Sequence, residues 1–185
     1  MMGTEYIRIS ELERLVRDPV PKKWQMIYRV LFFSALRANE LLTARVRQLV
    51  KTEDGYFLLL EKQKNGTKNE LTPMRKEDFR DLVWYVRNRR YQQDDYIFQG
   101  QRGKHTVQYL DRQIKKHGLL VGIRPFLASH AFRRGRVVHL ANQGVPYAEI
   151  STITRHKSVV MLMKHYDKDV KRRSYELLQR YGSYQ

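Results

Sequence analysis

The segment from residue 24 to residue 35 constrains the fold more than any other part of the chain. Its apolar residues recur at helical spacing over three turns: Trp24, Ile27, Tyr28, Leu31, Phe32 and Ala35. Residues three and four positions apart lie on one face of an α-helix. A face this apolar has to be buried, so the rest of the chain must build a core around it. We predict a helix that ends near Leu36.

Helical patterns also dominate the rest of the sequence. Ser10 and Glu13 have the form of a capping box, which predicts a short helix to about Asp18. Further helices are expected around residues 40–42, over residues 76–90, over residues 105–117 ending before Gly118, from Ser129 to about Asn142, from Pro146 onward, and after Ser158.

One part of the chain has the character of a β-hairpin. Residues 56–61 and residues 69–74 are short candidate strands, and the turn-forming pair Asn65-Gly66 lies between them. The fold class predicted is therefore mainly α with a small antiparallel hairpin or sheet, an α+β arrangement. No internal repeat or linker divides the chain.

The charge of the chain indicates a polyanionic partner. It has 36 Lys and Arg against 19 Asp and Glu, a formal net charge of +17. Such a field concentrates nucleic acid near the protein. Basic residues are spread along the chain, so the folded body carries the charge. Charge alone leaves an RNA-binding or ribosomal protein and an anionic-membrane binder as alternatives.

The residue types and clusters that the sequence lacks exclude several kinds of chemistry. The chain has no Cys, which excludes disulfides, thiolate metal sites and cysteine nucleophiles. It has no acidic cluster of the kind that two-metal nucleases need, since Asp94-Asp95 is the densest acidic pair. No signal-peptide segment and no apolar run of about 20 residues occurs, so we expect an intracellular protein.

Arg37 interrupts the end of the most apolar helix, and Glu40 follows it three residues later. This spacing places the two side chains on one helical face. An isolated Arg-x-x-Glu is most often a surface salt bridge. The functional alternative is an Arg that Glu40 holds and aims at a phosphate, because a guanidinium donates two parallel hydrogen bonds to an oxyanion.

Three further places carry polar residues that packing does not require. Lys62, Lys64 and Lys68 flank the hairpin turn. His130 and Arg133 share one face near the start of a helix, where phosphate is attracted. His156 and Tyr166 follow near the end of the chain. The simpler interpretations are a solvated hairpin tip, a basic helix end lying on DNA, and ordinary capping or packing residues.

Taken in order, these four places resemble the tyrosine recombinase family of phage integrases and Xer-type recombinases. Residues 35–41, Ala-Leu-Arg-Ala-Asn-Glu-Leu, are similar to the family's Gly-Leu-Arg-x-x-Glu-Leu box. His130 and Arg133 match its His-x-x-Arg, His156 its third motif, and Tyr166 its C-terminal Tyr. Lys64 resembles the family's hairpin Lys. The likeness extends over essentially the whole chain.

The chain departs from the family pattern at specific positions. Ala35 stands for the Gly of the first box, and Arg155 for the Gly before His156. Tyr166 lies ten positions after His156, where the family usually has nine. Tyr166 is still the best match, because Tyr147 precedes His156 and the later tyrosines lie much farther on.

The resemblance implies DNA cleavage through a 3′-phosphotyrosine, without a metal or any other cofactor. Arg37 and Arg133 would stabilise the charge on the phosphate oxygens, and His156 would hydrogen-bond the phosphate. A Tyr hydroxyl has an ordinary pKa near 10, so it needs help to attack.

The same resemblance assigns the proton transfers. His130 would assist the attack of Tyr166, and Lys64 would protonate the departing 5′ oxygen, with Lys62 its competitor. Two alternatives stay open. A type IB topoisomerase or telomere resolvase uses the same chemistry, and a non-enzymatic helix-turn-helix protein is a passable match to residues 137–166.

We expect residues 1–185 to form a single catalytic domain, either an excised fragment or a minimal member. The N-terminal helical domain that the family usually carries has no counterpart in these residues. Residues 168–185 read as an amphipathic tail that docks on a neighbouring protomer. The expected partners are double-stranded DNA and further copies of the chain, most simply a tetramer on paired sites. The expected location is the cytoplasm, on DNA.

Overall fold

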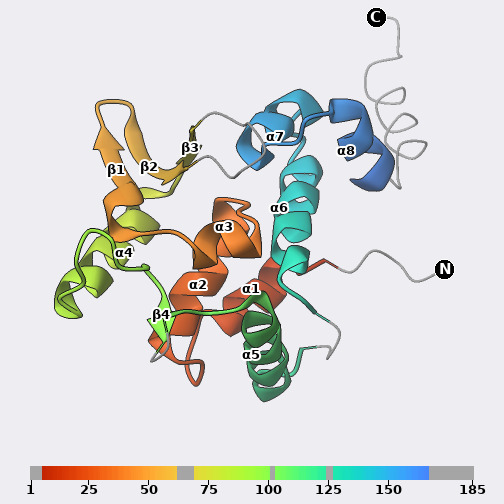
Figure 1. Ribbon diagram of the computed structural model, residues 1–185. Helices are drawn as coiled ribbons and strands as arrows, with labels where there is room; N and C mark the ends of the chain where they lie inside the picture. The colour runs from red at the N-terminus through yellow and green to blue at the C-terminus, as the bar shows by residue number, and fades with distance from the viewer. Residues whose placement is uncertain (1–5, 62–68, 101–102, 124–126, 167–185) are drawn as a thin grey trace, which may run out of the picture.

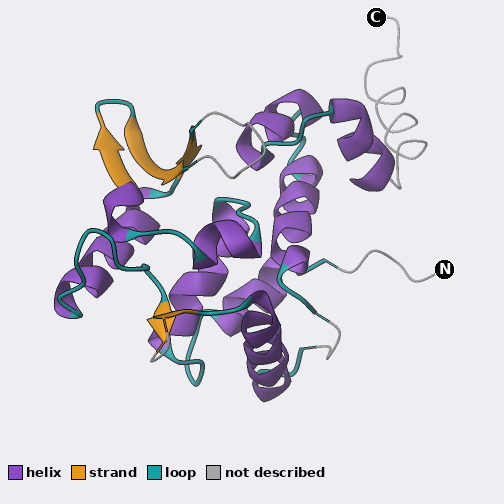
Figure 2. Cartoon of the chain, viewed as in Figure 1, coloured by secondary structure: helices purple, strands orange, loops and turns teal. Residues whose placement is uncertain are grey.

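A computed structural model describes residues 6–61, 69–100, 103–123 and 127–166 of the chain. Helices dominate it, and the strands form two small antiparallel sheets (Figures 1 and 2). The helices are α1 (Ile9–Leu15), α2 (Lys22–Phe33), α3 (Ala38–Leu42), α4 (Lys76–Asn88), α5 (Val107–Leu120), α6 (His130–Asn142), α7 (Tyr147–Thr154) and α8 (Val159–Tyr166). The strands are β1 (Leu49–Thr52), β2 (Gly55–Leu60), β3 (Glu70–Pro73), β4 (Gln99–Gly100) and β5 (Gly103–Lys104), and a 3-10 turn covers Val46–Gln48. The predicted fold class is confirmed.

Helix α2 runs through the main core, as its apolar spacing predicted. It contacts α1, α4 and α6. The Tyr28 ring stacks on Phe132 of α6, with ring centroids 5.4 Å apart. The Tyr28 hydroxyl also makes a 2.7 Å hydrogen bond with Nδ1 of His117 on α5. The first third of the chain and α6 therefore share one core, although about a hundred residues separate them in the sequence.

The predicted hairpin is present and has a third strand. β2 pairs with β3, with Leu58 opposite Thr72, and it also pairs with β1, with Leu58 opposite Leu49. β1 and the small β4–β5 hairpin were not predicted. Residues 61–69 join β2 to β3 and include Lys64, and residues 62–68 lie outside the described residues.

Several helix boundaries differ from their predictions by two or three residues: α1 ends at Leu15 and not near Asp18, and α2 ends at Phe33 and not near Leu36. Helix α1 begins at Ile9, and its first turn is closed by Glu11, which accepts a 2.8 Å hydrogen bond from the Arg8 N–H; Ser10 is therefore not the cap. Helix α5 continues through Gly118 to Leu120. A glycine costs a helix only about 1 kcal/mol, and the left-handed conformation that ends this segment falls at Gly122, where φ is +69°.

A second, smaller core joins the last three helices. It contains the buried residues Val137, Leu140, Ala141, Ile150 and Leu162. Helix α6 therefore belongs to both cores, and it carries α7 and α8 on its C-terminal half (Figure 1). Among the described residues, no helix is long and apolar enough to cross a bilayer.

Candidate active site

Arg37 lies at the N-cap position of α3, directly after the turn that ends α2. Its Nη1 donates a 2.7 Å hydrogen bond to Oε1 of Glu40, and its backbone N–H donates a 2.7 Å bond to Oε2 of the same carboxylate. Glu40 therefore holds both ends of Arg37, as the spacing predicted. The Arg37 side chain remains 58% exposed, which leaves the guanidinium accessible to a ligand.

Arg133 lies on α6 and is buried, with only 8% of its surface exposed. Its Nη1 donates a 2.6 Å hydrogen bond to the carbonyl oxygen of Ala35. Ala35 has a φ of +46°, in the left-handed region that favours glycine. The Gly of the family box would adopt this conformation without strain, whereas the Ala found here adopts it at a cost of about 1–2 kcal/mol.

His130 is the first residue of α6, and its side chain is exposed. Ser129 occupies the N-cap position, as expected, but its side chain makes no capping hydrogen bond. The Ser129 backbone N–H instead donates to Oδ1 of Asp111 at 2.8 Å. His130 and Arg133 are three residues apart on this helix, so one face presents an exposed imidazole one turn before a buried guanidinium.

His156 follows the end of α7 and is half-buried. Its Nδ1 lies 2.6 Å from Oγ1 of Thr154, and that hydroxyl donates a 2.7 Å hydrogen bond to the carbonyl oxygen of Ile150. A hydroxyl has a single proton, so Thr154 can only accept from His156. The Nδ1 of His156 therefore carries a proton, and this hydrogen bond fixes the tautomer of the ring.

Arg155 ends α7 in the left-handed conformation, with a φ of +54°. This is the position where the family has Gly, and the conformation explains that preference. The side chain is 6% exposed. Its Nη2 lies 2.5 Å from Oε2 of Glu40, and its Nη1 donates a 2.8 Å hydrogen bond to Oγ1 of Thr72 on β3. Sequence reasoning noted Arg155 only as a departure from the family, and it assigned no role to Thr154.

The carboxylate of Glu40 connects these groups. Burial by itself raises its pKa, but the nearby Arg155 charge and the hydrogen bonds from Arg37 outweigh burial and lower the pKa below its ordinary value. Glu40 is therefore ionised at neutral pH. Because Arg133 binds the backbone of the first motif and Arg155 binds Glu40, the three motifs around Arg37, Arg133 and His156 meet at one place.

Two predicted residues lie partly or wholly outside the described residues. Tyr166 is the last residue of α8, and its side chain lies outside the described residues. The helix is anchored by Leu162, which is 1% exposed and packs in the second core. Lys64 lies in the undescribed segment between β2 and β3. The proposed contributions of these two residues therefore remain predictions.

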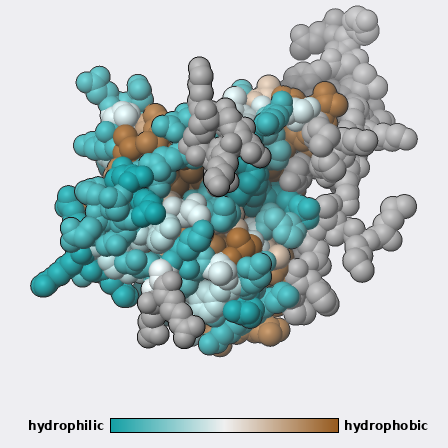
Figure 3. Space-filling view, viewed as in Figure 1, coloured by the Kyte–Doolittle hydropathy of each residue, from teal (hydrophilic) through white to brown (hydrophobic). Residues whose placement is uncertain are grey.

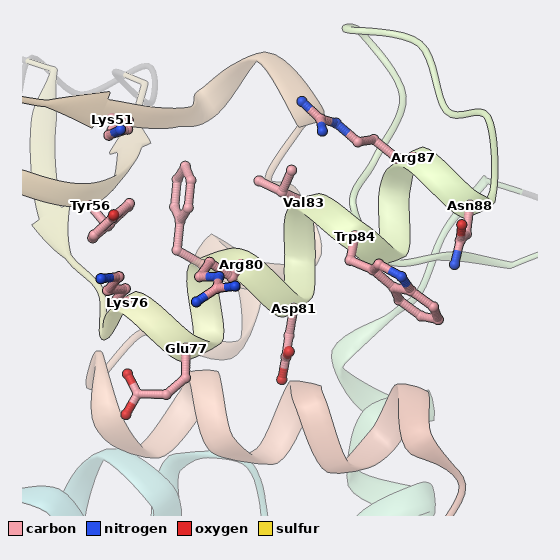
Figure 4. Close-up of a pocket in the computed structure, with 11 residues that line it drawn as sticks. Lys51, Tyr56, Lys76, Glu77, Arg80, Asp81, Val83, Trp84, Arg87 and Asn88 are labelled. Carbon is pink, nitrogen blue, oxygen red and sulfur yellow. The ribbon is translucent and has the colours of Figure 1, made fainter.

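A groove of about 1000 Å³ lies along α4, apart from the candidate residues (Figure 4). Its lining includes the cations Lys51, Lys76, Arg80 and Arg87, together with Trp84, which is 66% exposed. Among the described residues, no group of three or more His, Asp or Glu side chains is placed to hold a metal ion.

The fold defined by these elements is the tyrosine recombinase catalytic-domain fold. Known structures with the same arrangement include the XerA recombinase, which is 20% identical with a TM-score of 0.80, the match covering all of this chain and 66% of that one. The XerH site-specific recombinase bound to a palindromic difH substrate is 16% identical with a TM-score of 0.75, over 94% of this chain and 52% of XerH. The Tn1549 transposon integrase with transposon right-end DNA is 20% identical with a TM-score of 0.68, over 94% of this chain and 64% of the integrase.

Sequence comparison identifies the family. The phage integrase family model matches residues 5–173, so the chain belongs to this family. The resemblance predicted from the motifs is thereby confirmed. No curated protein sequence matches the chain. The chain spans about half to two thirds of the length of the three structures above.

Proposed function

We propose that the chain is the catalytic domain of a site-specific recombinase that cleaves and rejoins DNA through a 3′-phosphotyrosine. The observation that carries the proposal is the meeting of three motifs, made by the Arg133 bond to Ala35 and the Arg155 bond to Glu40. These bonds bring the segments that carry Arg37, Arg133 and His156 into contact in a chain with a net charge of +17.

The proposed chemistry uses fixed cations in place of a metal. Arg37 and Arg133 stabilise the charge that develops on the non-bridging phosphate oxygens during transfer. The Nε2 of His156 donates a hydrogen bond to the phosphate when the ring is protonated. Because the Thr154 hydroxyl already accepts a hydrogen bond from Nδ1–H of His156, the orientation of this ring is set before DNA binds.

The covalent step exchanges one phosphate ester for another. The Tyr166 oxygen bonds to phosphorus and loses its proton with the assistance of His130, while the bond from phosphorus to the 5′ oxygen breaks. Lys64 donates a proton to that oxygen. The phosphotyrosine retains the ester, so a 5′ hydroxyl from another strand reverses the step without ATP.

The relatives support DNA as the substrate. XerH was solved on its difH substrate before and after cleavage, and the Tn1549 integrase was solved on transposon DNA. A type IB topoisomerase or telomere resolvase would share the chemistry and differ in its products. A helix-turn-helix binding protein would leave Arg37, the hairpin Lys64 and Tyr166 without roles, so we favour the enzyme.

The test is the formation of a covalent complex between protein and DNA. The protein is incubated with a library of duplexes, denatured in detergent and run on a gel, and the adduct is mapped to a peptide. We expect attachment at Tyr166, loss of the adduct in Tyr166→Phe with DNA binding retained, and an adduct in the control Tyr109→Phe. Attachment elsewhere, or activity that chelator abolishes and magnesium restores, would contradict the proposed chemistry.

We also propose that several copies assemble on paired DNA sites through the end of the chain. Val160 and Met163 on α8 are 73% and 41% exposed, and Figure 3 shows apolar surface at the corner formed by α7 and α8. The amphipathic pattern of residues 168–185 suits such a surface. Truncation after Asp167 should weaken cooperative binding to paired sites more than binding to one site, whereas equal losses would contradict the assembly.

A further inference from the structure

We propose that Arg155 is a positioning residue that holds Arg37, through Glu40, in the orientation that binds the scissile phosphate. The inference rests on the proposed function and adds a residue that the family pattern does not supply, since the family has Gly at this position. Arg155 acts on the reaction only through other side chains.

The side chain of Arg155 is buried against two elements that lie far away in the sequence. It makes a 2.5 Å ion pair with Oε2 of Glu40 on α3 and a 2.8 Å hydrogen bond with Thr72 on β3. Its Nε also lies 3.5 Å from Oε2 of Glu70. The Arg155 side chain is 6% exposed and that of Glu40 15%, so solvent screens their interaction poorly. In Figure 1, α3 lies between α6 and the sheet that contains β3.

The carboxylate of Glu40 accepts hydrogen bonds from both Arg37 and Arg155, so Arg155 affects how Arg37 is held. Oε2 accepts from Arg155 and from the Arg37 backbone N–H, while Oε1 accepts from the Arg37 guanidinium. A lone ion pair of a half-exposed Arg is weak, because both side chains lose rotamer freedom to keep it. With Arg155 fixing the carboxylate, only the Arg37 side chain remains to be ordered.

The backbone at Arg155 indicates that its side chain contributes to the structure. A left-handed φ of +54° is disfavoured for any residue with a Cβ, and glycine adopts it freely. The contacts of the guanidinium must offset this strain for the conformation to persist. The same contacts connect the turn before His156 with α3, so they fix His156 and Arg37 relative to each other.

The experiment compares Arg155→Gly with Arg90→Gly in single-turnover cleavage at saturating DNA. Arg90 also adopts a left-handed conformation, with a φ of +55°, and its side chain is exposed, so this control removes the same strain and the same charge. We expect Arg155→Gly to slow cleavage about 10- to 100-fold, the effect of a misplacement near 1 Å. Arg90→Gly should change the rate less than 2-fold, and Arg155→Lys should recover part of the loss by restoring one charge.

A second substrate separates positioning from a general loss of structure. Replacing a non-bridging phosphate oxygen with a methyl group removes the negative charge that Arg37 stabilises. If Arg155 acts through Arg37, the rate loss of Arg155→Gly should shrink at least 5-fold on this neutral substrate, as it should for Arg37→Ala. The ratio of the two rates does not depend on the fraction of folded protein.

Equal rate losses of Arg155→Gly on both substrates, or no loss on either, would overturn the positioning role while the parent protein still cleaves DNA. A parent protein that forms no adduct with any duplex would instead overturn the proposed function, and this inference with it.

Discussion

The Nη1 of Arg133 donates a 2.6 Å hydrogen bond to the carbonyl oxygen of Ala35, 98 residues earlier in the chain. The left-handed conformation of Ala35 turns the chain after α2, and Arg37 follows two residues later. The buried guanidinium of Arg133 is thus hydrogen-bonded to the backbone two residues before Arg37. The two proposed phosphate ligands are placed relative to each other by the fold itself, before DNA is present.

Replacing Arg133 with Lys should therefore impair both stability and activity. A single ammonium cannot reproduce the planar donor geometry that serves the Ala35 carbonyl and the phosphate together. We expect a loss of about 1–3 kcal/mol in the free energy of unfolding, from a buried group with a poorer partner, and at least a 100-fold slower cleavage. Urea unfolding and adduct formation measure the two effects. The neighbouring Arg134→Lys should leave the stability within about 0.5 kcal/mol, and an equal loss there would contradict the explanation.

Two helical glycines should respond to alanine in opposite directions. At Gly135 on α6, a Cβ would meet the Ile7 carbonyl oxygen at 2.2 Å and Phe32 at 3.1 Å, so Gly135→Ala should destabilise by about 1–3 kcal/mol despite its better helix propensity. At Gly118 on α5, the nearest atom would lie at 3.7 Å, so Gly118→Ala should stabilise by about 0.5–1 kcal/mol. Urea titration of both proteins decides the signs. A stabilised Gly135→Ala would mean that the N-terminal segment moves aside at little cost.

Thr154 should affect the rate of DNA cleavage, because its hydroxyl orients the imidazole ring of His156. Thr154→Val keeps the shape and removes the oxygen that accepts from Nδ1 of His156, which allows the other tautomer and other ring orientations. We expect cleavage to slow about 10- to 100-fold, as for other groups that orient a reacting His. Thr152→Val is the matched control, because its exposed hydroxyl also donates to a backbone carbonyl on α7, that of Glu149. Similar rates for the two variants would remove Thr154 from the site.

The pH dependence of stability should include a contribution from His105. Burial and, second, the charge of Lys23 lower the His105 pKa from 6.5 to about 4. Between pH 6.5 and pH 4, His105 is therefore protonated in the unfolded chain and neutral in the folded protein. The free energy of unfolding falls as the pH drops through this range. His105→Phe removes the proton site and preserves ring packing on Trp24 and Tyr109. Unfolding free energies from pH 7.5 to pH 4 should fall less steeply in the variant, and parallel curves would contradict the assignment.

The parts of the fold that were predictable are those that local sequence determines. The helical spacing that begins at Trp24 and the alternation of the two hairpin strands depend on neighbouring residues, and the structure has α2 and the β2–β3 pair at these places. The predicted turn near Gly66 lies outside the described residues. β1 was not predicted, because Leu49–Thr52 is a short strand stabilised by its pairing with β2. Arg37 and Glu40 were paired correctly, since their contact spans three residues.

The missed parts of the site depend on contacts between distant segments. Arg155 reaches Glu40 across 115 residues and Thr72 across 83, and no local spacing encodes such contacts. The one available signal was the departure from glycine at Arg155. A charged residue at a position that favours a left-handed backbone has to gain its stability elsewhere, and here it does so on α3 and β3.

The sharpest remaining prediction concerns Lys64, which we propose as the general acid in preference to Lys62. If Lys64 protonates the leaving 5′ oxygen, Lys64→Ala should slow cleavage by roughly the 10²- to 10⁴-fold typical of general acid catalysis. Replacing that oxygen with sulfur creates a thiolate leaving group that barely needs a proton. Lys64→Ala should then cleave the sulfur substrate almost as fast as the parent does, whereas Arg37→Ala should stay slow because the phosphate charge is still unstabilised. A Lys64→Ala protein that is equally impaired on both substrates would exclude Lys64 as the general acid. If the sulfur substrate instead restored the cleavage rate of Lys62→Ala, Lys62 would be identified as the acid.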